Sequence, residues 1–348
     1  MFDVNTINYD SLQIEISTYC NASCPGCARN HQGGETKKFL PQKHMSLSTW
    51  KNLITPENIS KFGHFIINGS FGDPLMNPNI IEMLEHLASI KTDINCVIHT
   101  NGSLRDEKFF TNLANTMKKF EIHEVVFGID GLSDTHHIHR RQTKWQKIIE
   151  NLKTFNNAGG TSVWHMIVFN HNLSQIEECK SMAKNLGCRL FQLRKSYQPS
   201  IQAKKFLNYD QTTITSPSYD IVDDLIKKHN VDFVRQKNIG EQNKMSFSHS
   251  FSKKTQRKIC PWVKSKQLQV DVEGNIWPCC YVHEYQINPS QYPEWDINLL
   301  NQKFGVKFNS INDKKSISKI VNDIFFQKYV TESWSKLQSP ACKDCLGK

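Results

Sequence analysis

The chain has 348 residues, 38% hydrophobic and 22% charged, a profile that excludes a disordered tail, a collagen-like fibre and a disulfide miniprotein. An excess of 43 Lys and Arg over 33 Asp and Glu gives a net charge of +10, which favours an anionic partner such as a phosphorylated substrate, an acidic electron donor or nucleic acid. No segment resembles an export signal or reaches the length of a membrane span, so we expect a cytoplasmic protein with no membrane partner. The 11 cysteines then favour metal-binding or catalytic thiols over disulfides.

Apolar, β-rich runs alternate with amphipathic stretches in the first part of the chain. The expected strands are residues 12–17, 65–69, 94–99, 124–129, 162–169 and 189–193. After the first pair, their starts lie about 30 residues apart, which is the length of a βα unit. The pattern predicts an α/β fold with a parallel sheet, either an open doubly wound sheet or a partial barrel.

The alternation of strand-like and helix-like segments ends after the sixth predicted strand. Residues 198–218 are polar with two prolines, and a helix is expected over 219–229. Further on, the sequence predicts a hairpin over 267–276 and a helix over 317–337. We expect a barrel domain over 1–235, a linker over 236–259 and a second domain over 260–348.

Cys20, Cys24 and Cys27 form a C-x3-C-x2-C motif directly after the first predicted strand. Three thiolates in one short loop can hold a four-iron cluster and leave one iron open for a substrate or cofactor. The alternatives are a zinc knuckle, which needs a fourth ligand, and cysteines that are simply buried. The spacing favours the cluster.

With this motif the chain resembles the radical S-adenosylmethionine (SAM) superfamily, over roughly residues 10–200. The resemblance implies a partial (β/α)6 barrel. It also implies that the open iron binds SAM and that an electron from the cluster cleaves the cofactor to a 5′-deoxyadenosyl radical, which takes a hydrogen atom from the substrate. A flavodoxin- or ferredoxin-type protein is the implied reductant.

Further motifs lie where predicted strands end. Residues 69–74 resemble the family's Gly-Gly-Glu-Pro segment, which binds the methionine amino group, and residues 128–131 end the fourth strand, where the family contacts the ribose. His136 and Arg140 match a His-x3-Arg pattern whose arginine can pair with the methionine carboxylate. The resemblance thus implies cofactor contacts from Gly72, Asp73, Pro74, Thr100, Asn101, Asp130 and Arg140.

The chain departs from this family pattern at two positions. Gly26 stands where the family often has an aromatic residue near the adenine, so another side chain must cover that face. Asp73 replaces the usual glutamate, which shortens its reach by one methylene. Neither change removes a metal ligand.

The carboxyl ends of parallel strands lie on one rim, so loops distant in sequence meet there. Arg194 and Tyr197 follow the sixth strand, and we expect them on this rim as substrate contacts and candidate catalytic residues. Trp164 and His165 alternate mid-strand, so one of them faces the barrel interior. Histidines 136, 137 and 139 lie in a polar stretch and are expected to be solvated.

A second cysteine set has the pattern C-x13-G-x4-C followed by a distant C-x2-C. It resembles the twitch domain, the shortened form of the SPASM domain, in which a hairpin and a helix hold an auxiliary [4Fe-4S] cluster. The implied ligands are Cys260, Cys279, Cys342 and Cys345, with Cys280 as a rival for the second position. A zinc site with two cysteine pairs is the alternative. Cys96, Cys179 and Cys188 are expected to be buried hydrophobes.

The sequence therefore predicts a radical SAM oxidoreductase or maturase with two [4Fe-4S] clusters and SAM. A fully ligated auxiliary cluster suits electron transfer, so we expect net oxidation or rearrangement of a small molecule, such as a sugar or nucleotide. One alternative is peptide or protein modification, such as epimerisation or crosslinking. An alternative that is not an enzyme is a zinc-stabilised nucleic-acid-binding module, although nucleic acid is not the expected partner.

Overall fold

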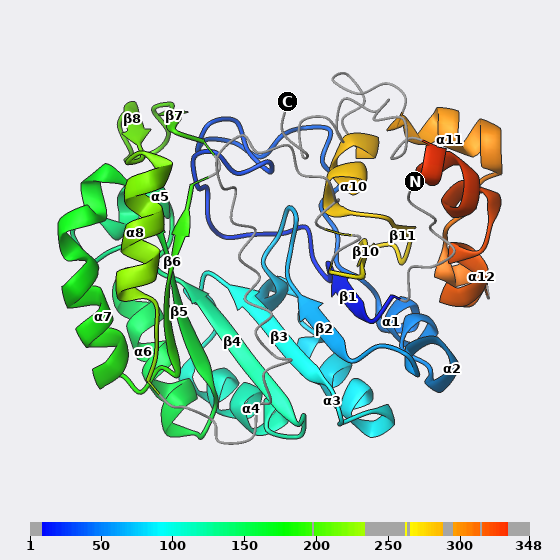
Figure 1. Cartoon of the computed structure of the whole chain (residues 1–348), viewed down its shortest axis with the longest axis horizontal. Helices are drawn as coiled ribbons and strands as arrows, with labels where there is room; N and C mark the ends of the chain where they lie inside the picture. Colours follow the sequence, from blue (N-terminus) through cyan, green and yellow to red (C-terminus); the bar gives the residue numbers. More distant parts are fainter. Residues whose placement is uncertain are drawn as a thin grey trace.

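The computed structural model describes residues 9–196, 198–233, 262, 265–287, 295–313 and 315–332. Its centre is one mixed sheet with the strand order β11-β10-β1-β2-β3-β4-β5-β6-β9 (Figure 1). Strands β1 to β6 lie side by side in chain order and are all parallel. The α/β class and the parallel arrangement expected of a partial barrel are confirmed.

The six parallel strands coincide closely with the predicted apolar runs. They are β1 Ser11–Ile14, β2 His64–Ile67, β3 Asn95–Thr100, β4 Ile122–Gly128, β5 Ser162–Val168 and β6 Leu190–Lys195. The short strand β9 (Val231–Asp232) pairs antiparallel with β6 and closes that edge. The sheet therefore brings the carboxyl ends of β1 to β6 to a single edge.

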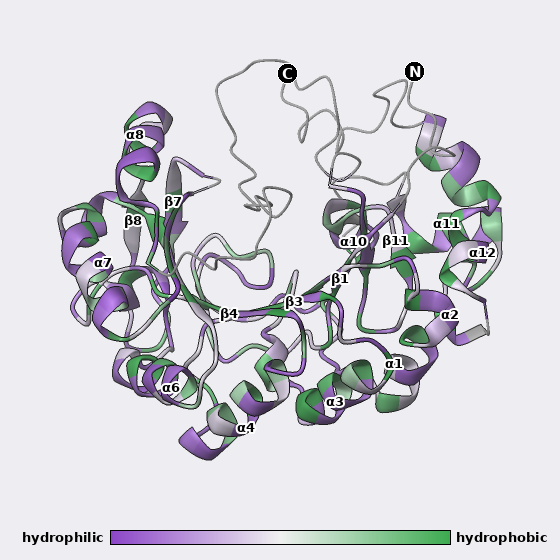
Figure 2. Cartoon of the chain, turned by 60° about the horizontal axis from the view of Figure 1, so that its bottom comes forward, coloured by the Kyte–Doolittle hydropathy of each residue, from purple (hydrophilic) through white to green (hydrophobic). Residues whose placement is uncertain are grey.

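Helices cover one side of this sheet, as Figure 2 shows for α1, α3, α4, α6 and α7. The helices of the barrel region are α1 Leu47–Leu53, α2 Pro56–Ile59, α3 Ile80–Ile90, α4 Glu107–Met117, α5 His136–His139, α6 Trp145–Asn157, α7 Ile176–Asn185 and α8 Tyr219–His229. Short 3-10 turns, η2 (Pro74–Met76) and η3 (Asn170–Gln175), follow β2 and β5. Each long helix buries an apolar stripe; α3, for example, buries Ile80, Met83, Leu84 and Leu87.

The two faces of the sheet differ in chemistry because side chains alternate along each strand. The helix-covered face carries the main core, with Ile98, Phe127 and Trp164 among its fully buried members. The opposite, inner face carries a small cluster of Val97, Val126 and Val163, packed by Leu190. Beyond this cluster, toward the carboxyl ends, the inner face becomes polar.

The carboxy-terminal region continues the same sheet. Strand β10 (Gln267–Val270) pairs parallel with β1, and β11 (Ile276–Trp277) pairs antiparallel with β10, which confirms the predicted hairpin. Gly274 in its turn has φ +82° and lies against Thr49 and Ile311, so no side chain fits there. The expected linker over 236–259 lies outside the described residues.

One predicted element in this region is wrong. In place of a continuous helix from Ile317, the chain forms α12 (Ile317–Val321) and then the π-helical η7 (Phe325–Val330). Asn322 caps the first, and Asp323 accepts a hydrogen bond from the Ile324 amide at 2.6 Å, so the chain breaks and restarts. Helices α10 (Cys280–Ile287) and α11 (Ile297–Phe304), with the turn η6 (Ile311–Asp313), complete the described part.

The polar stretch after β6 also has structure that the sequence did not predict. Residues 200–215 form an antiparallel hairpin of β7 (Ser200–Ala203) and β8 (Thr212–Thr215). Its Ile201 and Ile214 pack with Phe169 in a separate apolar cluster. The predicted helix that follows is confirmed as α8.

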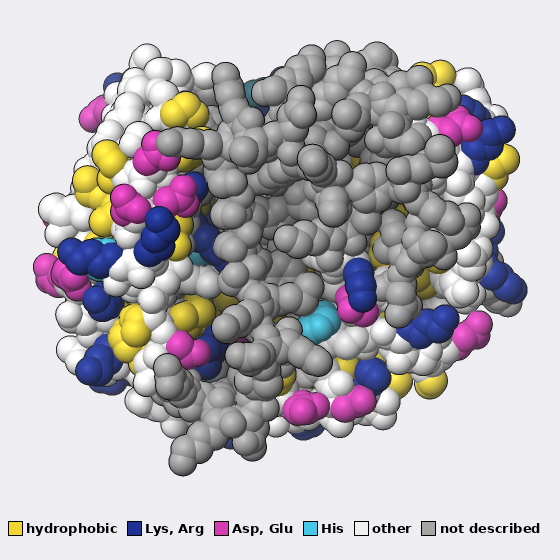
Figure 3. Space-filling view, in the orientation of Figure 1, with side chains coloured by type: hydrophobic (Ala, Val, Ile, Leu, Met, Phe, Trp, Pro, Cys, Tyr) yellow, Lys and Arg dark blue, Asp and Glu magenta, His cyan; other side chains and the backbone are white. Residues whose placement is uncertain are grey.

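The described surface shows neither a membrane-spanning helix nor, on the face in view, a single basic patch. No helix in the described ranges has the length and apolar character of a membrane span. On the face shown in Figure 3, the described Lys and Arg side chains alternate with Asp and Glu and do not gather into one patch. The excess positive charge is thus dispersed over this visible described surface.

Candidate active site

The loop after β1 carries Cys20, Cys24 and Cys27. All three thiols are half-buried and form no disulfide. Burial raises the pKa of Cys20, and the thiols of Cys24 and Cys27 raise it further, which places the three sulfurs within electrostatic reach of one another. The backbone curls back on itself: the Cys27 amide donates to the Cys24 carbonyl at 3.2 Å, and so does the Asn30 side chain at 3.0 Å.

Hydrogen-bond donors point at these sulfurs. The Ala22 amide lies 3.4 Å from the Cys20 Sγ atom, and the Asn101 Nδ2 atom lies 3.8 Å from it. Burial raises the pKa of Cys24 to about 12, although the charge of Arg140 opposes that rise. Donors and a guanidinium beside sulfur stabilise thiolate ligands, so the loop suits an iron-sulfur cluster.

Asp73 ties the loop after β2 to the end of β3. Its carboxylate accepts from the Leu75 amide at 2.9 Å, from the Thr100 hydroxyl at 3.0 Å and from the Asn101 amide at 2.8 Å. It is 4% exposed, and its neighbour Pro74 begins η2. Four of the expected cofactor contacts therefore meet here, with Asp73 as the connector between two loops.

Gly72 lies against the backbone that leads into the cysteine loop. A Cβ atom at this position would stand 2.0 Å from the Ser17 carbonyl oxygen. The Phe71 and Gly72 amides donate to the Glu15 carboxyl at 2.7 and 3.3 Å. Only glycine permits this approach, and burial raises the pKa of Glu15 to about 8.

Asp130 and Arg140 form the charged side of the site. Asp130, fully buried after β4, accepts from Arg140 Nε at 2.6 Å, from His139 Nδ1 at 2.7 Å and from the Ile167 amide at 2.7 Å. Burial alone would raise the pKa of Asp130, but Arg140 and His139 outweigh it and hold that pKa well below its usual value. Asp130 thereby fixes the guanidinium of Arg140 beside Cys24.

Two of the three histidines of α5, His136 and His139, are buried, contrary to the expectation of a solvated loop, whereas His137 is exposed as expected. His136 and His139 are 0% and 7% exposed. The Asp130 amide donates to His136 Nδ1 at 3.1 Å, and the His139 ring packs on Phe169 with centroids 4.7 Å apart. The buried charge of Asp130 needs these partners, and the sequence offered no local signal of them.

The face left uncovered by Gly26 is filled from the β7–β8 hairpin. Gly26 has φ +82°, and a Cβ atom there would lie 3.0 Å from Ile201 Cδ1. Arg141 holds the hairpin in place by donating to the carbonyls of Lys204 and Asp210 at 2.7 and 2.8 Å. Sequence analysis required some side chain to cover this face but could not name it, because Ile201, which lies against Gly26 in the structure, is far away in the chain.

The inner face of β3, β5 and β6 brings together His99, His165 and Arg194. Arg194 Nε donates to His165 Nε2 at 2.6 Å, and the rings of His99 and His165 meet edge to face with centroids 6.3 Å apart. Trp164 is fully buried on the other face, where its Nε1 donates to the Ile129 carbonyl. His165 is thus the inward residue of that pair, while Tyr197 lies outside the described residues.

Of the second cysteine set, only Cys279 and its rival Cys280 are described. Cys279 is 8% exposed and its sulfur accepts from the Val282 amide at the start of α10 at 3.5 Å. Cys260, Cys342 and Cys345 lie outside the described residues. Cys96, Cys179 and Cys188 are buried, as predicted.

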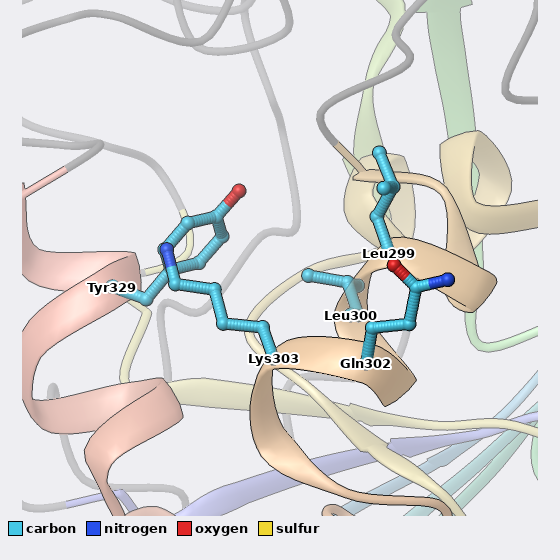
Figure 4. Close-up of a pocket in the computed structure, with 5 residues that line it drawn as sticks. All are labelled: Leu299, Leu300, Gln302, Lys303 and Tyr329. Atoms are coloured by element: carbon cyan, nitrogen blue, oxygen red, sulfur yellow. The ribbon is translucent and has the colours of Figure 1, made fainter.

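A separate cavity of about 400 Å³ lies between α11 and η7 (Figure 4). Its lining residues are Leu299, Leu300, Gln302, Lys303 and Tyr329. Lys303 Nζ lies 4.2 Å from the centre of the Tyr329 ring, a cation–π contact. None of these residues belongs to the parallel strands or the cysteine loop, so this cavity is distinct from the candidate active site.

Two family models match the sequence. Residues 14–183 match the radical SAM superfamily, and residues 260–346 match an iron-sulfur cluster-binding domain, SPASM. The chain therefore carries a radical SAM domain followed by a SPASM domain. Its cofactors are accordingly SAM and [4Fe-4S] clusters, and the cysteine loop after β1 lies within the radical SAM match.

The curated relatives of this radical SAM chain are distant. It is 27% identical to a GTP 3′,8-cyclase of Trichodesmium erythraeum over 153 residues, 42% of each chain. It is 28% identical to a GTP 3′,8-cyclase of Microcystis aeruginosa over 152 residues, 41% of this chain and 42% of the relative. The match thus spans about two-fifths of the length of these relatives.

Solved structures share the fold of the whole radical SAM chain. SuiB of Streptococcus suis bound to S-adenosylmethionine has a TM-score of 0.60 at 14% identity, covering 98% of this chain and 73% of SuiB. Native anSMEcpe with bound AdoMet has a TM-score of 0.55 at 14% identity, covering 97% and 82%. Both support the mixed α/β fold with a carboxy-terminal SPASM-like region.

The two family models favour iron-sulfur clusters over the zinc alternative. The part of the chain that is described contains no group of three His, Cys, Asp or Glu side chains placed to hold a single metal ion. A cubane is wider than one ion, so its ligands stand further apart. With both family models matched, the radical SAM enzyme replaces the nucleic-acid-binding module.

Proposed function

We propose that this radical SAM enzyme cleaves SAM reductively and takes a hydrogen atom from a small substrate, with net oxidation as the reaction class. The observation that carries the proposal is the cysteine loop: three thiols within electrostatic reach of one another, with amide donors and Arg140 directed at them. That loop stands at the edge of the sheet where β1 to β6 end, beside the polar inner face.

Cys20, Cys24 and Cys27 would hold the cluster, and Arg140 would bind the cofactor's carboxylate. When bound, the cluster and SAM supply a 5′-deoxyadenosyl radical to the inner face of the barrel. Arg140 suits its role because Asp130 and His139 fix its guanidinium beside Cys24. Asp73 positions Thr100 and Asn101, and Asn101 in turn donates toward the Cys20 sulfur. Ile201 covers Gly26 and keeps water from this side of the loop.

The auxiliary site is assigned to Cys279 with Cys260, Cys342 and Cys345. When bound there, a fully ligated cluster supplies an acceptor for the electron left on an oxidised substrate. Cys279 is favoured over Cys280 by its spacing from Gly274, and its sulfur accepts an amide hydrogen bond at the start of α10. We further propose a flavodoxin- or ferredoxin-type reductant, which the positive net charge of the chain would attract, and a cytoplasmic location.

Peptide or protein modification is the second candidate. It is supported by the likeness to SuiB bound to its precursor peptide SuiA, with a TM-score of 0.58, and to anSMEcpe bound to AdoMet and the Kp18Cys peptide, with a TM-score of 0.56. A short precursor peptide encoded beside this protein, and 5′-deoxyadenosine formed only when that peptide is added, would favour this candidate over a small molecule.

The proposed function is tested by 5′-deoxyadenosine formation from SAM in anaerobically reconstituted protein. Cys24→Ala should reduce cleavage to background, whereas Cys345→Ala should leave some cleavage but impair turnover of substrate. Cys179→Ala is the matched control, because that thiol is buried among hydrophobic residues. Equal cleavage by wild type and Cys24→Ala would refute the assignment.

A further inference from the structure

The inner face of the sheet carries a group of side chains with no role in holding the cofactor. Parallel register places His165 of β5 beside Gly128 of β4 and Gln192 of β6, and Arg194 lies one inward position further along β6. Arg194 Nη2 donates to Gln192 Oε1 at 3.1 Å. We call His99, His165, Gln192 and Arg194 the inner-face group; all four are half-buried.

The contact between Arg194 and His165 fixes the proton on the imidazole. A guanidinium in a protein only donates hydrogen bonds, so His165 Nε2, 2.6 Å from Arg194 Nε, must be the acceptor. A neutral imidazole that accepts at Nε2 carries its proton on Nδ1. His165 is therefore a neutral Nδ1–H donor, the less common of the two tautomers for a solvated histidine.

The charges around His165 favour this neutral form. Burial lowers its pKa well below the usual value, and Arg194, His99 and Arg140 lower it further, while Asp130 alone opposes them. Burial and Arg194 likewise lower the pKa of His99 to about 4. The positive field of Arg194 and Arg140 that disfavours protonation of the imidazoles would attract an anion.

This group adjoins the cysteine loop. At Gly128, the register partner of His165, a Cβ atom would stand 2.8 Å from Arg140 Nη2, so the guanidinium of Arg140 lies over that glycine. Arg140 in turn lies beside Cys24. A ligand on the inner-face group would therefore be next to the place where the cofactor is proposed to bind.

We propose that the inner-face group is the substrate-anchoring site and binds an oxyanion of the substrate, a carboxylate or a phosphate, through His165 Nδ1–H and the guanidinium of Arg194. This inference rests on the proposed function for the reaction, and it adds the substrate class: an anionic molecule. Arg194 acts both on the ligand and as the positioning residue that sets the tautomer of His165.

The test uses full-length protein with its clusters reconstituted in the oxidised state and its histidines labelled with ¹⁵N. Two-bond ¹H–¹⁵N spectra report the tautomer of each imidazole, and the His165 signals are those that vanish in His165→Asn. We expect His165 to be neutral at neutral pH, with its proton on Nδ1. A proton on Nε2 in the wild type would overturn the tautomer argument and with it the proposal.

The same samples are titrated with acetate and with methyl phosphate, and acetamide serves as the uncharged control. We expect a saturable shift of the His165 and His99 signals with one or both anions and none with acetamide. The anion that binds more tightly identifies the source, carboxylate or phosphate. No saturable shift with either anion would contradict the proposal.

Variants separate anchoring from folding. Arg194→Gln should weaken anion binding at least tenfold, or about 1.4 kcal/mol. His165→Asn, which keeps a donor near the Nδ1 position, should stay within about threefold of wild type, whereas His165→Leu should lose binding. Arg189→Gln removes the same charge beside the other end of β6, where Arg189 pairs with Asp232, and should leave anion binding unchanged.

Failure of this inference can be told apart from failure of the proposed function. Anion binding is measured without SAM, and SAM cleavage is measured without the anion. If wild type cleaves SAM but binds neither anion, only the substrate class is wrong. If Arg194→Gln binds the anions as tightly as wild type does, the inner-face group is not their site.

Discussion

Two fully buried carboxyl groups stand at the same edge of the sheet, and the chain handles their charges in opposite ways. Asp130, after β4, is held ionised by Arg140 and His139. Glu15, after β1, accepts from the backbone amides of Phe71 and Gly72, and burial raises its pKa to about 8. One group is neutralised by pairing and the other by keeping its proton.

The difference follows what each carboxyl group faces. Asp130 presents a guanidinium to Cys24, where a fixed positive charge is useful for an anionic cofactor group. Glu15 instead lies toward the carboxy-terminal region, with His283 of α10 3.8 Å away and Asp271 raising its pKa. The ionised carboxylate thus lies on the side of the rim where β4 and β5 end, and the protonated one lies beside the carboxy-terminal region.

The largest expected effect is the loss of stability when the ionised carboxylate of Asp130 is replaced. Asp130→Asn keeps an acceptor for the Ile167 amide but removes the charge that compensates Arg140, so we expect a loss of about 3–5 kcal/mol in the free energy of unfolding. Urea denaturation measures it. Asp93→Asn is the control, because Asp93 is 74% exposed beside Lys91 and should cost little. A loss below about 1 kcal/mol for Asp130→Asn would mean that the Asp130–Arg140 ion pair does not contribute substantially to stability.

The next effect is a pH dependence. Because the pKa of Glu15 is raised from 4.5 to about 8 on folding, its contribution to the free energy of unfolding is fully present below pH 4.5 and is lost as pH rises toward 8. Glu15→Gln should match wild type near pH 4.5 and become relatively more stable above it, by up to about 1.4 kcal/mol per pH unit. Asp130 has the opposite sign, since its lowered pKa contributes stability that is lost on acidification.

If the stabilities of wild type and Glu15→Gln change with pH in parallel between pH 4.5 and 8, the contrast drawn between Glu15 and Asp130 is wrong. They would indicate that Glu15 stays ionised at neutral pH, as Asp130 does. Thermal melts at closely spaced pH values, with Asp93→Asn as a reference for general charge effects, are sufficient to decide.

The smallest effect concerns the charged side of the rim, where the cysteine loop packs on the hairpin. Gly26→Ala should cost about 1 kcal/mol for its left-handed φ, and more for the contact with Ile201 Cδ1. Ile201→Ala in the same chain should relieve the contact but leave the backbone cost. If the loss in free energy of unfolding for Gly26→Ala combined with Ile201→Ala equals the sum of the two single losses, Ile201 does not contact residue 26 and does not cover Gly26.

Much of this architecture could be predicted from the sequence because it depends on local patterns. The apolar, β-branched runs gave β2 to β6 to within a few residues, and Glu273-Gly274-Asn275 gave the hairpin turn. The cysteine spacing indicated the loop that we propose holds the cluster, because its three cysteines lie within eight consecutive residues.

What could not be predicted depends on partners far apart in the chain. The parallel pairing of β10 with β1 joins residues more than 250 positions apart, and no local signal encodes it. His136 and His139 look solvated in a polar stretch and are buried only because Asp130 and Phe169 lie beside them. The hairpin over 200–215 is stabilised by Arg141, which the motif analysis did not single out.

The most direct test of the account is the electron paramagnetic resonance spectrum of the reduced, anaerobically reconstituted protein with and without SAM. If Cys20, Cys24 and Cys27 hold a cluster with an open iron, SAM should change the signal of one cluster in wild type and in Cys179→Ala. That change should be absent in Cys24→Ala. A reduced cluster signal that SAM leaves unchanged in wild type would contradict the central claim.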